Sequence, residues 1–262
     1  MPADGADGRR LLPLCRGLPG VTSERTQESA MEAAARVPNT RLKWGVVTVF
    51  SLATAGLVFT SPPDEILGTF VRFLYFHGAL TWVNLATFVG AAVAAGLYLA
   101  GKGADRYWWA ASLRYVSLVL WAMNTWMGFY SMKRTWGGIK WDEPRLAMSV
   151  WVMIAVLLAF GIDLALHNHK VSAVSDIALA LGVAVSTWYV VVIAAPKDFH
   201  PDSPVFNSGP EVIGFYLAMT ATSAVVIFAL ASLLKDRLAP RATPPEVIAG
   251  SPAAPESAEE AD

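Results

Sequence analysis

The middle of the chain alternates between long apolar stretches and short polar segments. A helix needs about 20 apolar residues to cross the roughly 30 Å hydrocarbon core of a bilayer. Six stretches reach or approach that length: Trp44–Phe59, Phe70–Leu99, Tyr107–Tyr130, Leu146–Leu166, Ile177–Ala195 and Val212–Leu234. No alternating pattern of about ten residues recurs, which argues against a membrane β-barrel. The pattern therefore predicts an all-α, polytopic membrane bundle of six transmembrane helices.

Composition narrows the functional classes. Hydrophobic residues make up 55% of the 262 residues, whereas charged residues make up 16% and the net charge is -1. A soluble domain carries about 25% charged residues, so this chain has too few polar side chains to cover a surface in water. The balance disfavours a soluble enzyme, a nucleic-acid-binding protein with a basic surface and a disordered regulator. We expect a multi-pass membrane protein, in contact with lipid and not with nucleic acid.

The two ends of the chain differ from its middle. Residues 1–40 mix Asp, Gly, Arg, Ser and Thr, and residues 238–262 are rich in Ala, Pro and Glu. Neither composition can bury a core, so both are predicted to be disordered cytoplasmic tails around a membrane domain of residues 41–237. Met31 is an alternative start, and a chain that began there would lack Cys15, the single cysteine.

The basic residues near the spans indicate an orientation. Lys and Arg accumulate in the cytoplasmic loops of membrane proteins, and an inside N-terminus puts ten of them inside and six outside. This distribution predicts an N-in/C-in topology. Four of the six outer residues belong to the loop Ser131–Arg145, between the third and fourth spans: Lys133, Arg134, Lys140 and Arg145. A basic cluster on the outer side points to a use other than setting the topology.

Polar residues within the spans are few. Arg114, Asp163 and Asp176 lie near the inner ends of spans, where snorkelling toward water lowers the cost of an ionised group. Asn84 and Asn124 are uncharged and are expected to bridge helices. The pattern predicts no proton or ion pathway, which disfavours a secondary transporter.

Three side-chain types that suit a haem gather on the predicted outer face. His77 lies at the outer end of the second span and His200 in the third outer loop, whereas His167 and His169 fall in an inner turn. Trp136 and Trp141 lie between the two outer histidines. Imidazoles ligate haem iron, flat aromatic rings pack against the macrocycle, and arginines pair with propionates. Taken alone, an interfacial histidine is more often hydrogen-bonded than a ligand, and paired tryptophans are often membrane-interface anchors.

At these residues the sequence resembles the haem-handling membrane proteins of cytochrome c assembly, and among them the haem exporter protein C (CcmC) type. The resemblance runs from about residue 44 to residue 234. Seven residues match the family's haem-site pattern: His77 and His200, which match the two ligands; Trp136, Trp141 and Asp142 of the tryptophan-rich motif; and the basic residues Arg72 and Arg145. The family motif usually reads Trp-Gly-x-x-Trp-x-Trp-Asp, and the run here is one residue shorter. Ile139 and Lys140 stand where the family tends to place tryptophan.

The resemblance implies a haem-binding and haem-transfer protein rather than an enzyme, with no catalytic residues. Haem b would bind transiently at the extracytoplasmic face and pass to a haem chaperone for c-type cytochrome biogenesis. His77 and His200 would hold the iron, and Arg72 and Arg145 would pair with the propionates. The resemblance also implies ABC transporter subunits in a haem-release complex. Because the chain lacks a Gly-x-x-x-x-Gly-Lys loop, any ATPase must be a separate chain.

Two other functions remain open. A structural subunit of a cytochrome c assembly complex would dock a partner through the segment Trp136–Asp142, which we call the tryptophan loop, without binding haem itself. A small-molecule permease would move a substrate without haem, but the scarcity of charges inside the spans disfavours it.

Overall fold

A computed structural model describes residues 40–194, 205 and 208–239 of the chain. The predicted tails lie outside this part of the chain, apart from Thr40, Leu238 and Ala239, and so does His200. The described part contains six α-helices and one π-helical turn: α2 (Thr40–Thr60), α3 (Val71–Leu99), α4 (Ala104–Trp136), α5 (Pro144–Leu166), α6 (His169–Tyr189), η1 (Val190–Ala194) and α7 (Pro210–Leu238). The prediction of an all-α bundle of six helices is confirmed.

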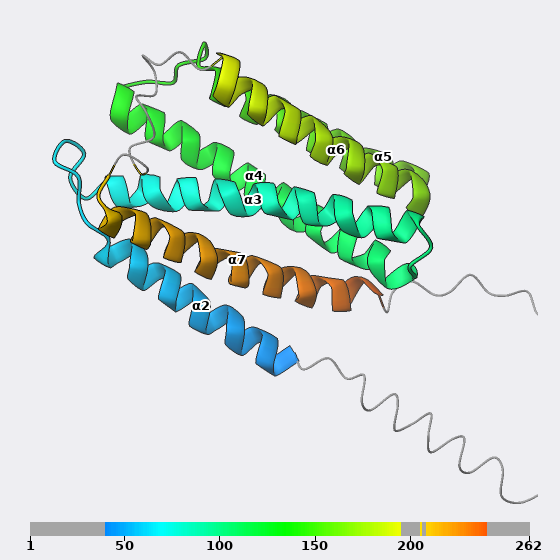
Figure 1. Ribbon diagram of the computed structural model, residues 1–262. Helices are drawn as coiled ribbons and strands as arrows, with labels where there is room; N and C mark the ends of the chain where they lie inside the picture. Colours follow the sequence, from blue (N-terminus) through cyan, green and yellow to red (C-terminus); the bar gives the residue numbers. More distant parts are fainter. Residues whose placement is uncertain (1–39, 195–204, 206–207, 240–262) are drawn as a thin grey trace, which may run out of the picture. The chain divides into compact units, whose positions relative to one another are not determined.

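The helices pack in pairs. In Figure 1, α3 and α4 lie between the pair α2–α7 and the pair α5–α6, and the inter-helix contacts agree with this order. Short connections between α3 and α4, α4 and α5, and α5 and α6 make these neighbours antiparallel. One end of the bundle holds the start of α3, the end of α4 and the start of α5, and we call it the His77 end. The opposite end holds the α3–α4 and α5–α6 turns, and we call it the Arg114 end.

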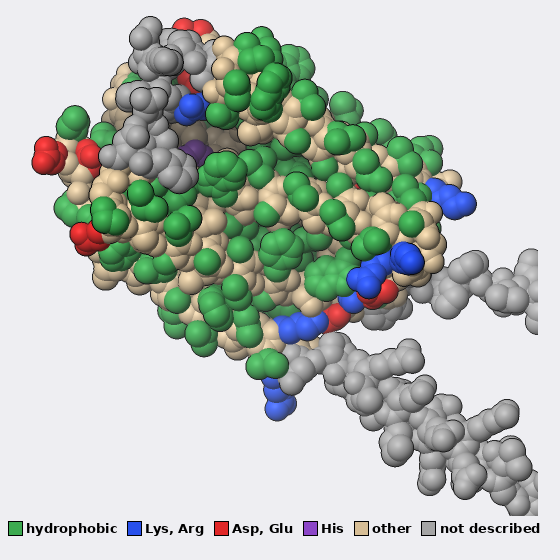
Figure 2. All heavy atoms as spheres, in the orientation of Figure 1, with side chains coloured by type: hydrophobic (Ala, Val, Ile, Leu, Met, Phe, Trp, Pro, Cys, Tyr) green, Lys and Arg blue, Asp and Glu red, His purple; other side chains and the backbone are tan. Residues whose placement is uncertain are grey.

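Five of the helices are long and apolar enough to cross a membrane: α2, α3, α5, α6 with η1, and α7. Figure 2 shows apolar side chains over most of one face, with charged side chains toward the ends. The predicted span Tyr107–Tyr130 is the exception, because α4 does not reach that apolarity. The reason is its position: α4 contacts α3, α5, α6 and α7, so neighbouring helices rather than lipid cover much of its surface. Its buried residues therefore include Ser112, Ser117 and Asn124.

Local chemistry sets the helix ends. Gly101 and Gly103 take positive φ angles of 77° and 95° between α3 and α4, and Gly137 takes 72° directly after α4. Residues without a Cβ adopt this conformation most readily. Pro144 occupies the first turn of α5, and the carboxylate of Glu143 accepts a hydrogen bond of 2.6 Å from a backbone N–H of that turn. Both features are typical of helix starts.

The packing of α4 against α5 centres on Trp121. Its side chain is 1% exposed and meets Phe88 edge to face, with ring centroids 5.7 Å apart. The indole Nε1 donates a 2.8 Å hydrogen bond to the backbone oxygen of Ser149 in α5. The same apolar cluster contains Val152, Val156, Ala180 and Val183. Trp121 therefore links α4 to α3 and to the α5–α6 pair.

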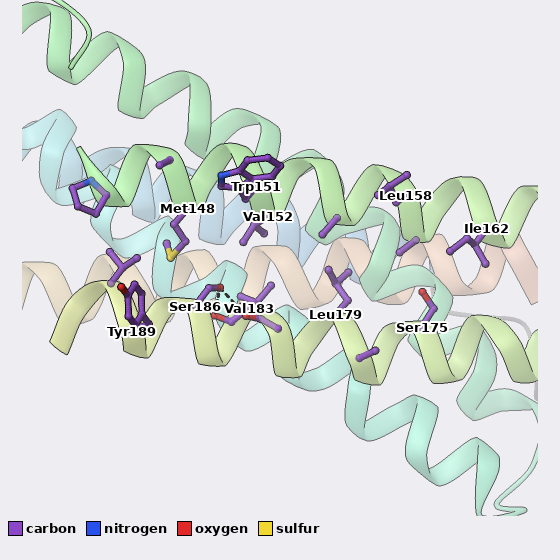
Figure 3. A pocket seen from close by; sticks show the side chains of 17 residues that line it. Met148, Trp151, Val152, Leu158, Ile162, Ser175, Leu179, Val183, Ser186 and Tyr189 are labelled. Carbon is purple, nitrogen blue, oxygen red and sulfur yellow. Dashed lines mark hydrogen bonds between the residues drawn. The ribbon is translucent and has the colours of Figure 1, made fainter. Parts of the chain in front are cut away.

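An apolar groove runs between α5 and α6 (Figure 3). Its walls hold large side chains, such as Trp151 and Leu158, and its lining also includes Ala155, Ala159 and Gly182. Leu158 is 62% exposed and Trp151 is 68% exposed. The α5–α6 pair thus offers a long apolar surface of the kind that hydrocarbon covers.

Replacing Trp121 by Ala should lower the free energy of unfolding by about 3–5 kcal/mol, the usual effect of truncating a buried aromatic residue. Chemical unfolding of the protein in detergent micelles measures this change. Trp126→Ala is the matched control on the same helix, because Trp126 is 63% exposed and loses chiefly its stacking on Tyr130, which should change stability by no more than about 1.5 kcal/mol. Equal effects of the two substitutions would contradict this account of the core.

Candidate functional site

His77 lies in the second turn of α3 and packs against α4. A Cβ added at Gly128 would lie 4.0 Å from the His77 Cε1 atom, an ordinary contact distance, so the imidazole lies directly against this turn of α4. The side chain of Asn124, one turn earlier on α4, also interacts with the ring. The Nδ1 atom of His77 is buried and has no hydrogen-bond partner among the described residues. Buried polar atoms are nearly always satisfied, so this nitrogen suits a ligand.

A row of polar side chains continues from His77 along the α3–α4 interface, and we call it the polar seam. Asn124 Nδ2 donates to the Thr81 hydroxyl at 2.9 Å, and that hydroxyl also lies 3.0 Å from the His77 backbone oxygen. Deeper in the bundle, the Thr87 and Ser117 hydroxyls are 2.6 Å apart, and Thr87 also contacts the Asn84 side chain at 3.1 Å. The predicted bridging role is confirmed for Asn124. Asn84 instead bonds within its own helix.

The tryptophan loop lies at the same end of the bundle as His77. Trp136 is half-buried and is the last residue of α4. Trp141 is 68% exposed, and its ring lies 5.8 Å from that of Phe129 between centroids. Asp142 is exposed as well. The loop therefore offers one largely uncovered indole close to the end of α4.

The two predicted arginines have different surroundings. Arg72 Nε donates a 2.8 Å hydrogen bond to the Ser61 backbone oxygen, just after α2, so this side chain supports the α2–α3 connection. Arg145 lies in the first turn of α5, and its Nε is buried without a hydrogen-bond partner in the described part of the chain. Arg145 therefore has a buried donor, Nε, without an acceptor among the described residues, whereas Nε of Arg72 has one.

The remaining histidines separate as the topology predicts. His167 and His169 lie at the α5–α6 turn, at the Arg114 end. The His169 ring stacks on Tyr107 with centroids 3.9 Å apart. On the visible face in Figure 2, a hollow toward the end of the bundle where α3 begins contains a histidine and a basic side chain. His200, the second predicted ligand, lies outside the described residues.

Sequence reasoning missed an aromatic cluster at the His77 end. Phe70 and Phe73 stack at 5.6 Å, and both meet Tyr130 edge to face at 6.0 and 5.2 Å. Trp126 stacks on Tyr130, and the Arg134 guanidinium lies 5.7 Å from the Phe70 ring centroid. The available signal was the spacing of Trp126, Tyr130 and Arg134, four residues apart on one helix face.

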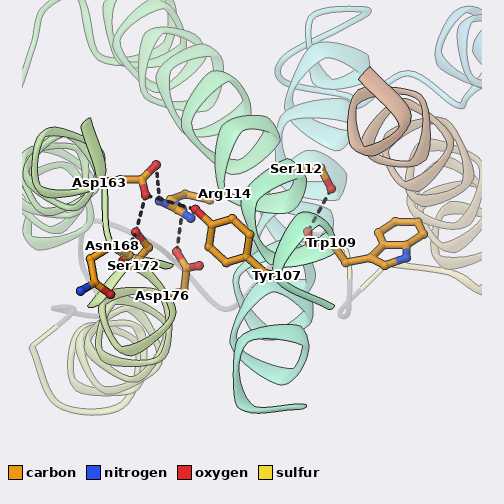
Figure 4. A network of polar contacts seen from close by, with 8 residues as sticks. All are labelled: Tyr107, Trp109, Ser112, Arg114, Asp163, Asn168, Ser172 and Asp176. Atoms are coloured by element: carbon orange, nitrogen blue, oxygen red, sulfur yellow. Dashed lines mark hydrogen bonds and ion pairs between the residues drawn. The ribbon is translucent and has the colours of Figure 1, made fainter. Parts of the chain in front are cut away.

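The prediction that the charged residues within the spans reach separately toward water is wrong. These residues pair with one another instead (Figure 4). Arg114 Nη1 lies 2.9 Å from Asp163 Oδ2, and Arg114 Nε lies 2.8 Å from Asp176 Oδ1. Arg114 is 2% exposed and Asp176 is 3% exposed. Pairing replaces snorkelling because α4, α5 and α6 bring the three groups together at the same depth. We call this group the Arg114 cluster.

No protein-family model matches the chain, and no curated protein is similar to it at a significant level. The resemblance to haem-handling proteins of cytochrome c assembly therefore remains a prediction from the residues named above.

Arg72→Ala should speed amide hydrogen–deuterium exchange in the connection formed by residues 61–70. The substitution removes a charge-assisted hydrogen bond to Ser61, and such bonds contribute about 1.5–3 kcal/mol. Mass spectrometry of peptides from this segment measures the exchange rates. Lys133→Ala, which removes an exposed basic residue at the same end, is the control. An unchanged rate in Arg72→Ala would show that Arg72 does not support the connection.

Proposed function

We propose that the protein binds haem at the His77 end of the bundle and presents it to an acceptor for c-type cytochrome biogenesis. Haem is the cargo, and the protein performs no bond chemistry on it. The observation that carries the proposal is the buried, unpartnered Nδ1 of His77, at the same end as Trp136, Trp141 and Arg145.

The chemistry of these side chains fits a haem. A neutral imidazole is a common axial ligand of haem iron, and His77 has a ring nitrogen without a partner. Arg145 suits a propionate, because a guanidinium pairs well with carboxylates and its buried Nε lacks an acceptor. Trp141 offers an exposed flat ring. His200 is the proposed second ligand, and Asp142, Arg72 and the exposed Lys133 and Lys140 belong to the same proposed surface.

Each residue has a distinct role in holding the cargo. Gly128 and Asn124 position the His77 ring from α4, so that the imidazole does not have to be ordered when haem arrives. His77 and His200 would together supply the two imidazoles that hold the iron when haem is bound. Release then requires one imidazole to withdraw, and we assign that role to His200 because His77 belongs to a continuous helix.

The proposed membrane arrangement has six spans, with α4 as the sixth, and an N-in/C-in topology in the cell inner membrane. The length of α4, 33 residues, and its antiparallel packing against α3 support a sixth crossing. In this arrangement the His77 end faces the extracytoplasmic side. The proposed acceptor is an extracytoplasmic haem chaperone, and ABC transporter subunits would drive release.

Protein purified from a haem-sufficient host should have a Soret band. His77→Ala and His200→Ala should each lose most of the band, because each removes one iron ligand, and added imidazole should restore part of it to His77→Ala. His167→Asn is the matched control: His167 lies at the opposite end with a φ of 47°, a conformation that Asn tolerates. Visible absorption spectra of the wild type and of the three variants measure the strength of the Soret band.

A wild-type protein without a Soret band, even after haem is added, would overturn the proposal. A band of equal strength in His77→Ala, without added imidazole, would exclude His77 as a ligand.

The topology gives a separate prediction. On a Cys15→Ser background, Ile139→Cys should react with a membrane-impermeant maleimide in intact spheroplasts, because Ile139 lies in the exposed tryptophan loop. Lys170→Cys, at the exposed α5–α6 turn, should react only after the membrane is opened. The reverse pattern would place the His77 end in the cytoplasm.

The exposed indole of Trp141 also favours a second function, the docking of a partner protein by a structural subunit. Cytochrome c maturation in a complemented host separates the two functions. A haem-binding protein should lose activity in the His77→Ala, His200→Ala double variant. A structural subunit should keep activity in that variant and lose it when residues 136–145 are deleted.

A further inference from the structure

The Arg114 cluster joins three helices through charged and hydroxyl groups. Arg114 forms the two ion pairs of the cluster. In addition, Asp163 accepts a hydrogen bond from the Ser172 hydroxyl, and the Tyr107 hydroxyl lies 3.5 Å from the Asp163 Oδ1 atom. Figure 4 shows these side chains pointing toward one another from α4, α5 and α6. The cluster is separate from the proposed haem site, which lies at the other end of the bundle.

The charges in the cluster do not balance. One guanidinium lies between two carboxylates, so full ionisation leaves one negative charge in excess. The side chains of Arg114 and Asp176 are only 2% and 1% exposed. A buried unpaired charge loses several kcal/mol of solvation even after relaxation, and water has little access to supply it here.

No other described cation compensates for the excess. On α4, Asp105 pairs with Lys235 of α7 at 2.7 Å, and that pair is more exposed. On α6, Lys170 is exposed and His169 stacks on Tyr107. On α3, the Tyr98 ring packs against Tyr107. Arg114 is therefore the one described cation that contacts the two carboxylates.

The two carboxylates have unequal surroundings. Asp163 receives the guanidinium and the Ser172 hydroxyl, its side chain is 14% exposed, and the Tyr107 hydroxyl lies nearby. Hydrogen bonds of this kind stabilise an ionised carboxylate. Asp176 contacts only the guanidinium, through Oδ1, and its buried Oδ2 has no hydrogen-bond partner within the described residues.

We propose that the Arg114 cluster is a proton-binding site, in which one proton is held on the Asp176 carboxyl group. Binding transfers a proton from a hydronium ion of the aqueous phase: one O–H bond of hydronium breaks, which leaves water, and one O–H bond forms at Asp176 Oδ2. It leaves a neutral Asp176 beside the Arg114–Asp163 ion pair, so the buried charge sums to zero. The proton comes from the aqueous phase at the Arg114 end, where Asp163 and the exposed α5–α6 turn lie.

Charge balance predicts a number of protons for each variant. The wild-type cluster should hold one proton at neutral pH. Asp176→Asn and Asp163→Asn should each hold none, because one carboxylate then faces one guanidinium. Arg114→Gln should hold two, because no cation remains. Asp105→Asn, which removes an exposed carboxylate at the same end, should leave the count at one.

Infrared spectroscopy of the full chain in lipid vesicles counts these protons. A protonated carboxyl group has a C=O stretching band that shifts in D2O, and wild-type-minus-variant difference spectra isolate the cluster. We expect the band to disappear completely in both aspartate-to-asparagine variants, to double in Arg114→Gln and to persist in Asp105→Asn. In the unsubstituted protein the same band should disappear as the pH is raised, which tests the site without any substitution.

Two results would overturn the proposal. The first is a wild-type spectrum in which neither the pH titration nor the Asp176→Asn difference changes the carboxyl band, since both aspartates would then be ionised. The second is a cluster whose carboxylate bands respond to added Na⁺ and not to pH, since a metal ion would then supply the missing charge.

Discussion

The α3–α4 interface is the contact on which the rest of the bundle depends. Along it, Asn124 bonds to Thr81 and Ser117 bonds to Thr87, so polar side chains of the seam join the two helices, as is common between membrane helices. The seam positions His77 at one end and approaches Arg114 at the other. The pairs α2–α7 and α5–α6 then pack on the outside of α3 and α4. The proposed haem site and the Arg114 cluster therefore share one helix, α4, which pairs with α3 at the seam and with α5 and α6 at the cluster.

The sequence predicts the helices well because apolar length is a local property. Within the described residues each predicted span lies on an observed helix, and Gly101, Gly137 and Pro144 fall at the helix ends. The sequence misjudged the apolarity of α4, because a helix covered by protein on most sides can hold Ser, Asn and Arg. That information belongs to the tertiary arrangement and not to the 18 or 20 residues of a span.

The candidate site was predictable only in part. The topology brings His77, Trp136, Trp141 and Arg145 to one end, as the alternation of spans requires. The partners of each side chain were not predictable, because they depend on the rotation of a helix about its axis. A helical residue turns by about 100° per position, so a small change of rotation would aim His77 at lipid instead of at Gly128. The pairing of Arg114 with Asp163 and Asp176 needs three such rotations to agree.

The tryptophan loop is a short tether with both ends fixed. Gly137 closes α4 on one side, and Glu143 and Pro144 begin α5 on the other, so few residues separate two rigid elements. Trp121, about four turns below the loop on α4, bonds to the backbone of Ser149 in the second turn of α5. The position of Trp141 therefore depends on the distance between α4 and α5. A partner that binds the exposed indole and displaces it would also change the packing of α4 against α5. A change in that packing would in turn move the indole.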